Sequence, residues 1–156
     1  MYKYKTSPFK HQRQALIEGA KLHNFAYFME MGTGKTKVAI DNTAYLYQEK
    51  RIDFAFVIAP NSVYQNWKKE IDFHCPEETN IYIWKVTKDK TFKLDPNKLT
   101  FILMNVEALS HASGKKWLEY KLLKHGMRSM IILDESTSIK NLKASRTKAI
   151  IKLGKL

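Results

Sequence analysis

The feature that most constrains this chain is the segment of residues 25–36, which reads Phe-Ala-Tyr-Phe-Met-Glu-Met-Gly-Thr-Gly-Lys-Thr. A short apolar run leads into a glycine-bearing turn and then into residues suited to begin a helix. Such a turn exposes backbone N–H groups at a helix N-terminus and therefore attracts anions. Gly32 and Gly34 allow the backbone to wrap a phosphate without an obstructing Cβ atom. We therefore expect a strand at 25–29, a phosphate-binding turn and a helix at 35–48.

The side chains that follow the glycines extend this prediction. In a phosphate loop the lysine reaches the β- and γ-phosphates and the next hydroxyl ligates Mg²⁺. Lys35 and Thr36 occupy these two positions. Met29 stands where the strict pattern has its first glycine. The alternative interpretation is an ordinary glycine turn before a basic helix.

The charge of the chain indicates a polyanionic partner. The chain has 156 residues, of which 44% are hydrophobic, enough for one domain with a core. Its formal net charge is +12 and its pI is about 9.7, which favours nucleic acid as the partner. A basic soluble protein without such a partner is the alternative. The sequence has no apolar run that would span a bilayer and no signal-type segment, so we expect an intracellular protein.

Apolar runs alternate with helical patterns along the whole chain, which predicts an α/β fold. The expected sheet is mostly parallel, with helices on both faces. We expect strands at 25–29, 54–59, 81–86, 101–105 and 130–133, and helices at 10–23, 35–48, 61–73, 114–125 and 142–153. Asn61 or Ser62 is suited to cap the third of these helices. Ligands of such sheets bind beyond the carboxyl ends of the strands.

A second group of chemical residues follows the last expected strand. Asp134 and Glu135 come directly after the apolar run 130–133. Asp134 is suited to hold Mg²⁺, directly or through water, and Glu135 to orient and deprotonate an attacking water. Alone, such a pair also fits a solvated acidic turn. Together with the phosphate loop, it indicates phosphoryl transfer to water.

With these motifs in order, the chain resembles the first RecA-like ATPase domain of helicase superfamily two, and within it the Swi/Snf-type DNA translocases. In that family the first position of the phosphate loop is usually not glycine, which fits Met29. The resemblance covers nearly the whole chain. It rests on Pro8-Phe9-Lys10-His11-Gln12, the phosphate loop, Ile58-Ala59-Pro60-Asn61-Ser62 with Asn66-Trp67, Asp134-Glu135-Ser136-Thr137 and Ile139-Lys140-Asn141.

The resemblance implies one RecA-like domain over residues 1–156, with ATP and Mg²⁺ as cofactors and DNA, double-stranded in this branch, as the partner. Gln12 would select adenine, and Thr36 and Asp134 would hold the metal. The implied nucleotide contacts are Gln12, Met31, Gly32, Thr33, Gly34, Lys35 and Thr36, and the implied backbone contacts to nucleic acid are Asn61, Ser62 and Lys140. Open alternatives are a restriction-type translocase, an RNA helicase, or a nucleic-acid-binding module with a vestigial nucleotide site.

The chain also departs from the family pattern. Thr137 stands where the family often has a histidine that links the nucleotide site to the next motif. The family's next strand and its second RecA-like lobe, with arginine fingers worth about 10³–10⁵ in rate, do not follow within these residues. We therefore expect a fragment with weak turnover or none, completed in the native protein by a second lobe in cis. Its sheet would be gapped, or filled by a partner chain, for example through self-association.

Two side chains have competing interpretations. Gln12 either reads adenine or is an exposed polar residue on a helix. Trp67 is suited to stack on a base, but its helical spacing with Val63 and Ile71 favours a place in the core. The histidines show no metal-ligand spacing with Cys75, which argues against a zinc site.

Overall fold

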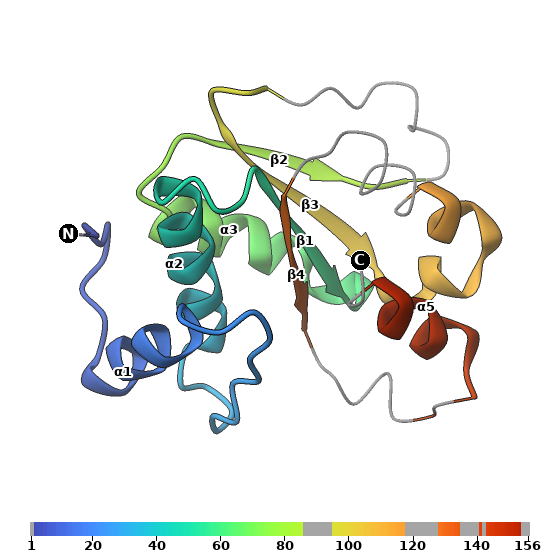
Figure 1. The fold of residues 1–156 in the computed structure, drawn as a ribbon, viewed down its shortest axis with the longest axis horizontal. Helices are drawn as coiled ribbons and strands as arrows, with labels where there is room; N and C mark the ends of the chain where they lie inside the picture. The colour runs from blue at the N-terminus through green and yellow to red at the C-terminus, as the bar shows by residue number, and fades with distance from the viewer. Residues whose placement is uncertain (1, 86–94, 118–127, 135–140, 142, 154–156) are drawn as a thin grey trace.

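The described sheet of the computed structural model consists of four parallel strands in the order β2-β3-β1-β4 (Figure 1). The structure describes residues 2–85, 95–117, 128–134, 141 and 143–153. The strands are β1 (Phe54–Ala59), β2 (Thr79–Ile83), β3 (Leu99–Asn105) and β4 (Ser129–Leu133). Every residue of β1 is buried, as expected of a central strand covered on both faces. This arrangement confirms the α/β fold with a parallel sheet.

Helices cover both faces of the sheet. The described helices are α1 (Lys10–Gly19), α2 (Lys35–Gln48), α3 (Tyr64–His74) and α5 (Ser145–Leu153), with 3₁₀ turns η1 (Asn61–Val63) and η3 (Val106–Ser110). Among the described elements, helix α1 packs against α2 and not against the sheet. Because side chains alternate along a strand, Ala55, Val57 and Ala59 pack in the cluster that contains α2 and α3 residues. Phe54, Phe56 and Ile58 pack in the cluster that contains η3 and α5 residues. No helix in the described ranges is long and apolar enough to cross a membrane.

Most expected elements are present, with shifted ends. The predicted bounds of α2 and β1 are confirmed, while β2 begins and ends earlier than the predicted 81–86. Helix α3 begins at Tyr64 after η1, and neither Asn61 nor Ser62 caps it through a side chain. The predicted helix 114–125 is helical up to residue 117, and its remainder lies outside the described residues.

Helix α1 ends at Gly19, not at residue 23 as predicted. A Cβ atom at Gly19 would lie 2.4 Å from the hydroxyl oxygen of Tyr27, so the returning chain packs against the end of the helix. The backbone then turns, and the N–H of Leu22 donates to the carbonyl of Gly19 at 3.2 Å. The periodicity of the sequence continues past this point, but the tertiary contact ends the helix.

The predicted strand at 25–29 is wrong, because this segment has no place in the described sheet. Strand β4 pairs with β1 and forms the edge of that sheet. The segment is held through side chains instead. Asn42 Nδ2 donates to the hydroxyl of Tyr27 at 3.1 Å, and Tyr27 and Met29 pack against the cluster around Leu16. A strand needs a neighbouring strand for its backbone groups, and none of the described strands lies beside this segment.

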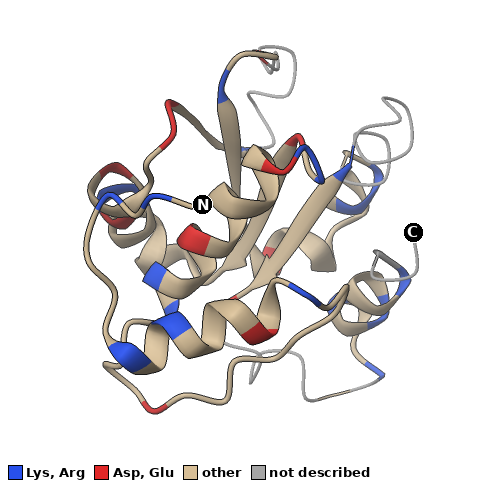
Figure 2. Cartoon of the chain, turned by 60° about the vertical axis from the view of Figure 1, so that its left-hand side comes forward, with Lys and Arg blue, Asp and Glu red and all other residues tan. Residues whose placement is uncertain are grey.

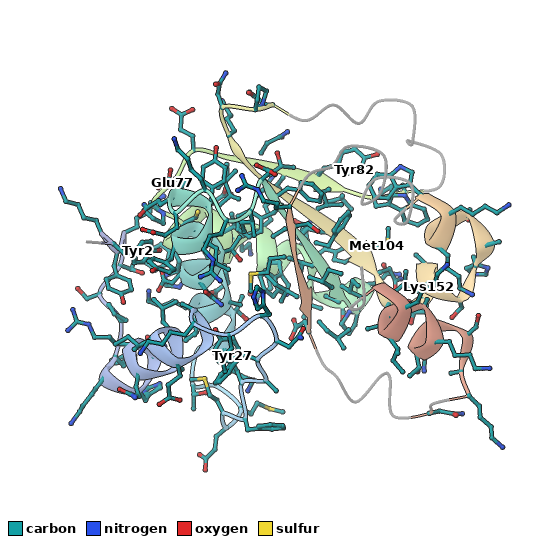
Figure 3. All side chains as sticks on the ribbon, in the orientation of Figure 1. Tyr2, Tyr27, Glu77, Tyr82, Met104 and Lys152 are labelled. Carbon is teal, nitrogen blue, oxygen red and sulfur yellow. The ribbon has the colours of Figure 1, made fainter. Side chains whose placement is uncertain are left out.

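The N-terminal segment is fixed to α2 by contacts of its tyrosines with a buried ion pair inside that helix. Lys37 and Asp41 are 2.6 Å apart with side chains 6% and 2% exposed. The hydroxyl of Tyr2 donates to Asp41 Oδ1 at 2.9 Å, and the ammonium of Lys37 lies 5.5 Å from the centroid of the Tyr4 ring. Figure 3 shows Tyr2 beside α2. Burial, and then the charge of Asp41, raise the pKa of the Tyr2 hydroxyl well above its usual value.

We expect Asp41→Ala to lower the free energy of unfolding by about 3–5 kcal/mol, because the variant leaves the buried Lys37 ammonium without its partner. Urea titration followed by circular dichroism measures this change. The matched control is Glu78→Ala, which removes an exposed ion pair with Lys98 and should cost about 1 kcal/mol or less. Equal unfolding midpoints for the two variants would contradict the prediction.

The stability of the chain should also depend on the ionisation of His74. Its ring bonds to the Thr6 hydroxyl through Nδ1 and lies 3.1 Å from Glu70 Oε2 through Nε2. Burial first, and then the charge of Lys37, lower the pKa of His74 below its ordinary value of 6.5. Protonation therefore favours the unfolded chain, so this stability is complete above pH 6.5 and falls as the pH drops through 6.5 toward the folded pKa.

Urea unfolding at pH 7.5 and 5.5 tests this dependence. The wild-type chain should lose more stability over this interval than His74→Asn, which cannot take up the proton. His23→Asn, a change at an exposed histidine, should behave like the wild type. If His74→Asn loses as much stability as the wild type between the two pH values, His74 is not the responsible group.

Candidate functional site

The phosphate loop has the backbone conformation that its glycines predict. Gly32 and Gly34 both have φ of 79°, in the left-handed region that favours glycine. Gly34 is the N-cap residue of α2, and no side chain caps this helix start through a hydrogen bond. The first amides of α2 are therefore available for an acceptor from outside the helix.

Lys35 is folded back into the loop. Its Nζ atom donates to the carbonyls of Met29 at 3.0 Å and of Glu30 at 2.9 Å. The hydroxyl of Thr33 donates to the same Glu30 carbonyl at 2.7 Å. The loop thus satisfies the hydrogen bonds of its lysine with neutral backbone oxygens, and an anion would compete with these oxygens for the ammonium. Met31 is another predicted nucleotide contact. Its side chain is 96% exposed, so only its backbone is suited to face a phosphate.

Gln12 and the phosphate loop, far apart in the sequence, are in direct contact. The Gln12 side chain accepts from the Phe9 N–H through Oε1 at 2.9 Å and donates to the Thr33 carbonyl through Nε2 at 3.0 Å. His11 Nε2 lies 3.1 Å from the same carbonyl. A Cβ atom on Gly34 would lie 2.4 Å from Gln12 Nε2, so the glycine also makes room for this amide. Gln12 is 5% exposed, which overturns the interpretation as an exposed polar residue.

A cavity of about 380 Å³ opens beside Gln12 and the loop glycines. Its remaining wall comes from the N-terminal segment and from the C-terminal end of α3. The residues that line it are Thr6, Ser7, Phe9, His11, Gln12, Gly32, Thr33, Gly34, Lys37, Glu70, Phe73 and His74. This volume is within the range of small-molecule sites. No motif of the sequence indicates that α3 contributes to this wall.

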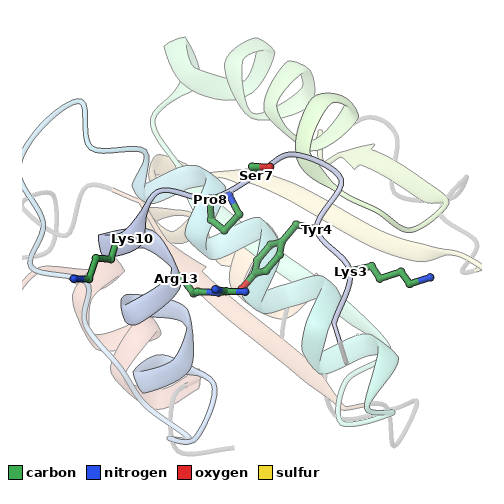
Figure 4. Close-up of a pocket in the computed structure, with 6 residues that line it drawn as sticks. All are labelled: Lys3, Tyr4, Ser7, Pro8, Lys10 and Arg13. Carbon is green, nitrogen blue, oxygen red and sulfur yellow. The ribbon is translucent and has the colours of Figure 1, made fainter.

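A larger hollow, of about 610 Å³, lies along α1 and is lined by none of the phosphate-loop residues. Figure 4 shows the Tyr4 ring beside Arg13, while Lys3 and Lys10 extend away from the hollow. Because its cationic groups do not converge, this hollow is a poorer anion site than the loop.

Asp134 lies at the carboxyl end of β4. Its backbone N–H continues the strand pairing by donating to the Ile58 carbonyl at 2.9 Å. Its side chain accepts a hydrogen bond at Oδ2 from Trp67 Nε1 at 2.8 Å. Trp67 is 2% exposed, which confirms its place in the core and rules out base stacking. The predicted partner Glu135 lies outside the described residues.

The phosphate loop and Asp134 face the same end of the molecule. Thr43 on α2 contacts Met130 on β4, with 3.5 Å between Oγ1 and Sδ. In Figure 1, α2 runs away from the loop while β4 runs back toward that side. Thr36 precedes Thr43 by roughly 10 Å along the helix axis, and Asp134 follows Met130 by roughly 13 Å along the strand. Because the two elements run in opposite directions, Thr36 and Asp134 lie on the same side of this contact. No hydrogen bond or ion pair between described residues joins the loop to Asp134.

The side-chain oxygens of Thr36 and Asp134 suit Mg²⁺ better than a metal ion whose ligands all come from the protein. Within the described part of the chain, no cluster of three or more His, Cys, Asp or Glu side chains could hold a metal ion. Thr36 and Asp134 would supply one hydroxyl and one carboxylate. Mg²⁺ typically takes one or two protein oxygens together with waters and substrate phosphates, so this donor set fits it.

The predicted nucleic-acid contacts lie on a separate element. Asn61 and Ser62 are exposed in η1, directly after β1, and Lys140 lies outside the described residues. Figure 2 shows Lys and Arg on several elements, with acidic residues among them. Of the two groups predicted to follow strands, Asp134 does follow β4, whereas the phosphate loop follows a segment that is not a strand.

Comparison with known proteins identifies the family. Residues 19–155 match the SNF2-related domain. Among curated proteins, the chain is 31% identical over 133 residues to a chromatin-remodeling ATPase INO80 of Schizosaccharomyces pombe and 29% identical over 126 residues to that of Arabidopsis thaliana. Each match takes in 78% of this chain, and the chain spans about 8% of the length of these relatives.

A solved structure shares the fold. It is described as the Sulfolobus solfataricus SWI2/SNF2 ATPase core in complex with dsDNA, and it superposes with a TM-score of 0.71 at 22% identity. The match covers 96% of this chain and 30% of that chain. The family match takes in most of the sequence, and the glycine loop at the start of α2 lies within the matched residues. The chain therefore belongs to the SNF2-related domain family, as a lobe of the Swi/Snf type.

Proposed function

We propose that this chain is the ATP-binding first lobe of an ATP-dependent translocase that acts on double-stranded DNA. The observation that carries the proposal is the convergence of Lys35 and Gln12 on one glycine loop at the uncapped start of α2. The names of the relatives, chromatin-remodeling ATPases and a core in complex with dsDNA, support it. A second lobe in cis would supply the groups that complete turnover, so the chain alone should hydrolyse ATP weakly or not at all.

The roles of the loop residues follow from their contacts. Lys35 exchanges the Met29 and Glu30 carbonyls for oxygens of the β- and γ-phosphates. The backbone amides from Met31 to Thr36 would donate to the same phosphates. Thr36 and Asp134 would hold Mg²⁺, which when bound would neutralise charge on the phosphoryl group, and Glu135 would orient the attacking water.

Gln12 is suited to select the base. A primary amide offers two N–H groups and two lone pairs, and its contacts to Phe9 and Thr33 use one of each. The remaining N–H and lone pair match the acceptor and donor on the edge of adenine. The adjoining cavity of about 380 Å³ provides the space for the nucleoside.

Asn61, Ser62 and Lys140 would contact the DNA backbone. Asn61 and Ser62 are exposed in η1. The excess of basic residues over the whole chain gives it a net charge of +12. Contacts of this kind position a protein on DNA without reading its sequence. The proposal places the protein on DNA inside the cell.

Lys35→Ala should weaken binding of ATP with Mg²⁺ by about 10–100-fold, because it removes charge-assisted hydrogen bonds to the phosphates. Isothermal titration calorimetry with a non-hydrolysable ATP analogue measures this change. Lys68→Ala, which alters an exposed lysine of α3, is the matched control and should bind like the wild type. If the wild-type chain does not bind the nucleotide, the enzyme proposal is lost, and a vestigial nucleotide site becomes the better account.

Binding to double-stranded DNA should fall with salt, with a log–log slope of roughly −0.9 for each phosphate contacted. Fluorescence anisotropy of a labelled duplex between low and physiological salt gives this slope. Asn61→Ala with Ser62→Ala should weaken binding, whereas Gln65→Ala, at an exposed position of α3, should not. A flat salt response would remove the electrostatic basis of the proposal.

A further inference from the structure

A buried indole fixes the side chain of Asp134. Trp67 Nε1 donates to Asp134 Oδ2 at 2.8 Å, across 67 positions of the sequence. The Trp67 ring belongs to the core cluster that includes Ala59, Ile71 and Leu103. With 2% of Trp67 exposed, the ring has little freedom to turn, so the direction of its N–H is set by core packing.

This hydrogen bond is not a general consequence of burying tryptophan. Trp84 is also buried, at 7% exposure, yet its indole nitrogen has no hydrogen-bond partner among the residues that the structure describes. Trp67 thus satisfies its polar atom specifically with the carboxylate. Because a buried N–H without an acceptor is costly, the pairing also holds the carboxylate in one orientation.

Trp67 donates to one of the two carboxylate oxygens of Asp134. Asp134 Oδ2 is engaged by the indole, while within the described part of the chain Oδ1 accepts no hydrogen bond. Residues that donate to a metal-binding group from outside the coordination sphere orient it and adjust its basicity. A carboxylate held in this way presents Oδ1 to a cation or to a water bound to it.

We propose that Trp67 is a positioning residue for the metal-binding carboxylate of Asp134, acting through its indole N–H. The inference rests on the proposed function, in which Asp134 holds Mg²⁺ together with Thr36 and the phosphates. Trp67 also lies on α3, which continues directly from η1 with Asn61 and Ser62. The segment proposed to touch DNA and the donor that orients Asp134 therefore belong to one continuous stretch, residues 61–74.

The first experiment uses the wild-type chain with ¹⁵N-labelled tryptophan. Its three indole N–H signals are assigned by Trp→Phe replacements, and Mn²⁺ with a non-hydrolysable ATP analogue is titrated in. Paramagnetic broadening falls steeply with distance from the metal. The Trp67 signal should therefore broaden first, at Mn²⁺ levels that leave Trp84 and Trp117 visible. Broadening of Trp67 no earlier than the other two would overturn the inference.

The second experiment compares Trp67→Phe with Trp84→Phe. Both replace a buried indole by a smaller ring, but only the former removes a described hydrogen bond to Asp134. Trp67→Phe should raise the Mg²⁺ concentration for half-maximal binding of a fluorescent ATP analogue by about 10–100-fold. Its binding of the same analogue without Mg²⁺ should match the wild type. Trp84→Phe should leave the Mg²⁺ requirement unchanged.

The outcomes separate this inference from the proposed function. Equal Mg²⁺ requirements for the two variants, with nucleotide still bound, would overturn the role of Trp67 and leave the nucleotide site intact. Absence of nucleotide binding by the wild-type chain would overturn both. If Trp67→Phe does not fold, as judged by circular dichroism, the broadening experiment on the wild-type chain decides.

Discussion

The parallel pairing of β4 with β1 is the constraint on which the candidate site depends. Its register sets Leu133 opposite Ile58, and the Asp134 N–H extends the pairing to the Ile58 carbonyl. The carboxyl ends of both strands therefore lie side by side, one leading into η1 and the other into Asp134. Since α3 covers the same face beyond η1, Trp67 comes within reach of the carboxylate. A shift of register would separate all of these groups.

The elements that the sequence predicted well are those with strong local signals. The six apolar residues of β1 specify a strand buried on both faces, and the glycines before Lys35 specify where α2 begins. The segment 25–29 looks equally strand-like in isolation. Whether it is a strand depends on a neighbour that supplies backbone partners, and the edge of the described sheet is β4. Likewise, the end of α1 is decided by its contact with Tyr27, which no periodicity reveals.

The candidate site was predictable to a similar degree. The order of motifs in the sequence singled out the loop, Gln12 and Asp134 as candidates, since each motif carries its chemistry in adjacent residues. The contact of Gln12 with Thr33 and the bond from Trp67 to Asp134 join residues that are distant in sequence. Helical spacing correctly assigned Trp67 to the core. Such spacing identifies the buried face of a helix, but it does not show which group accepts the hydrogen bond of the indole N–H. The roles of Glu135 and Lys140 stay predictions.

The polar groups of the site differ in how much they must move to meet a ligand. Gln12 and Asp134 are each held by partners in the surrounding fold, so their remaining hydrogen-bonding positions are already oriented. Lys35 is bound to carbonyls of its own loop, and these bonds must break before it can meet a phosphate. Because the side chains of Gln12 and Asp134 are already oriented, they lose less entropy when a ligand binds. Lys35 would instead exchange hydrogen bonds to neutral carbonyls for stronger bonds to an anion. Because a neutral ligand cannot offer that replacement, under the proposed function the loop would discriminate by charge, and Gln12 by shape and hydrogen bonding.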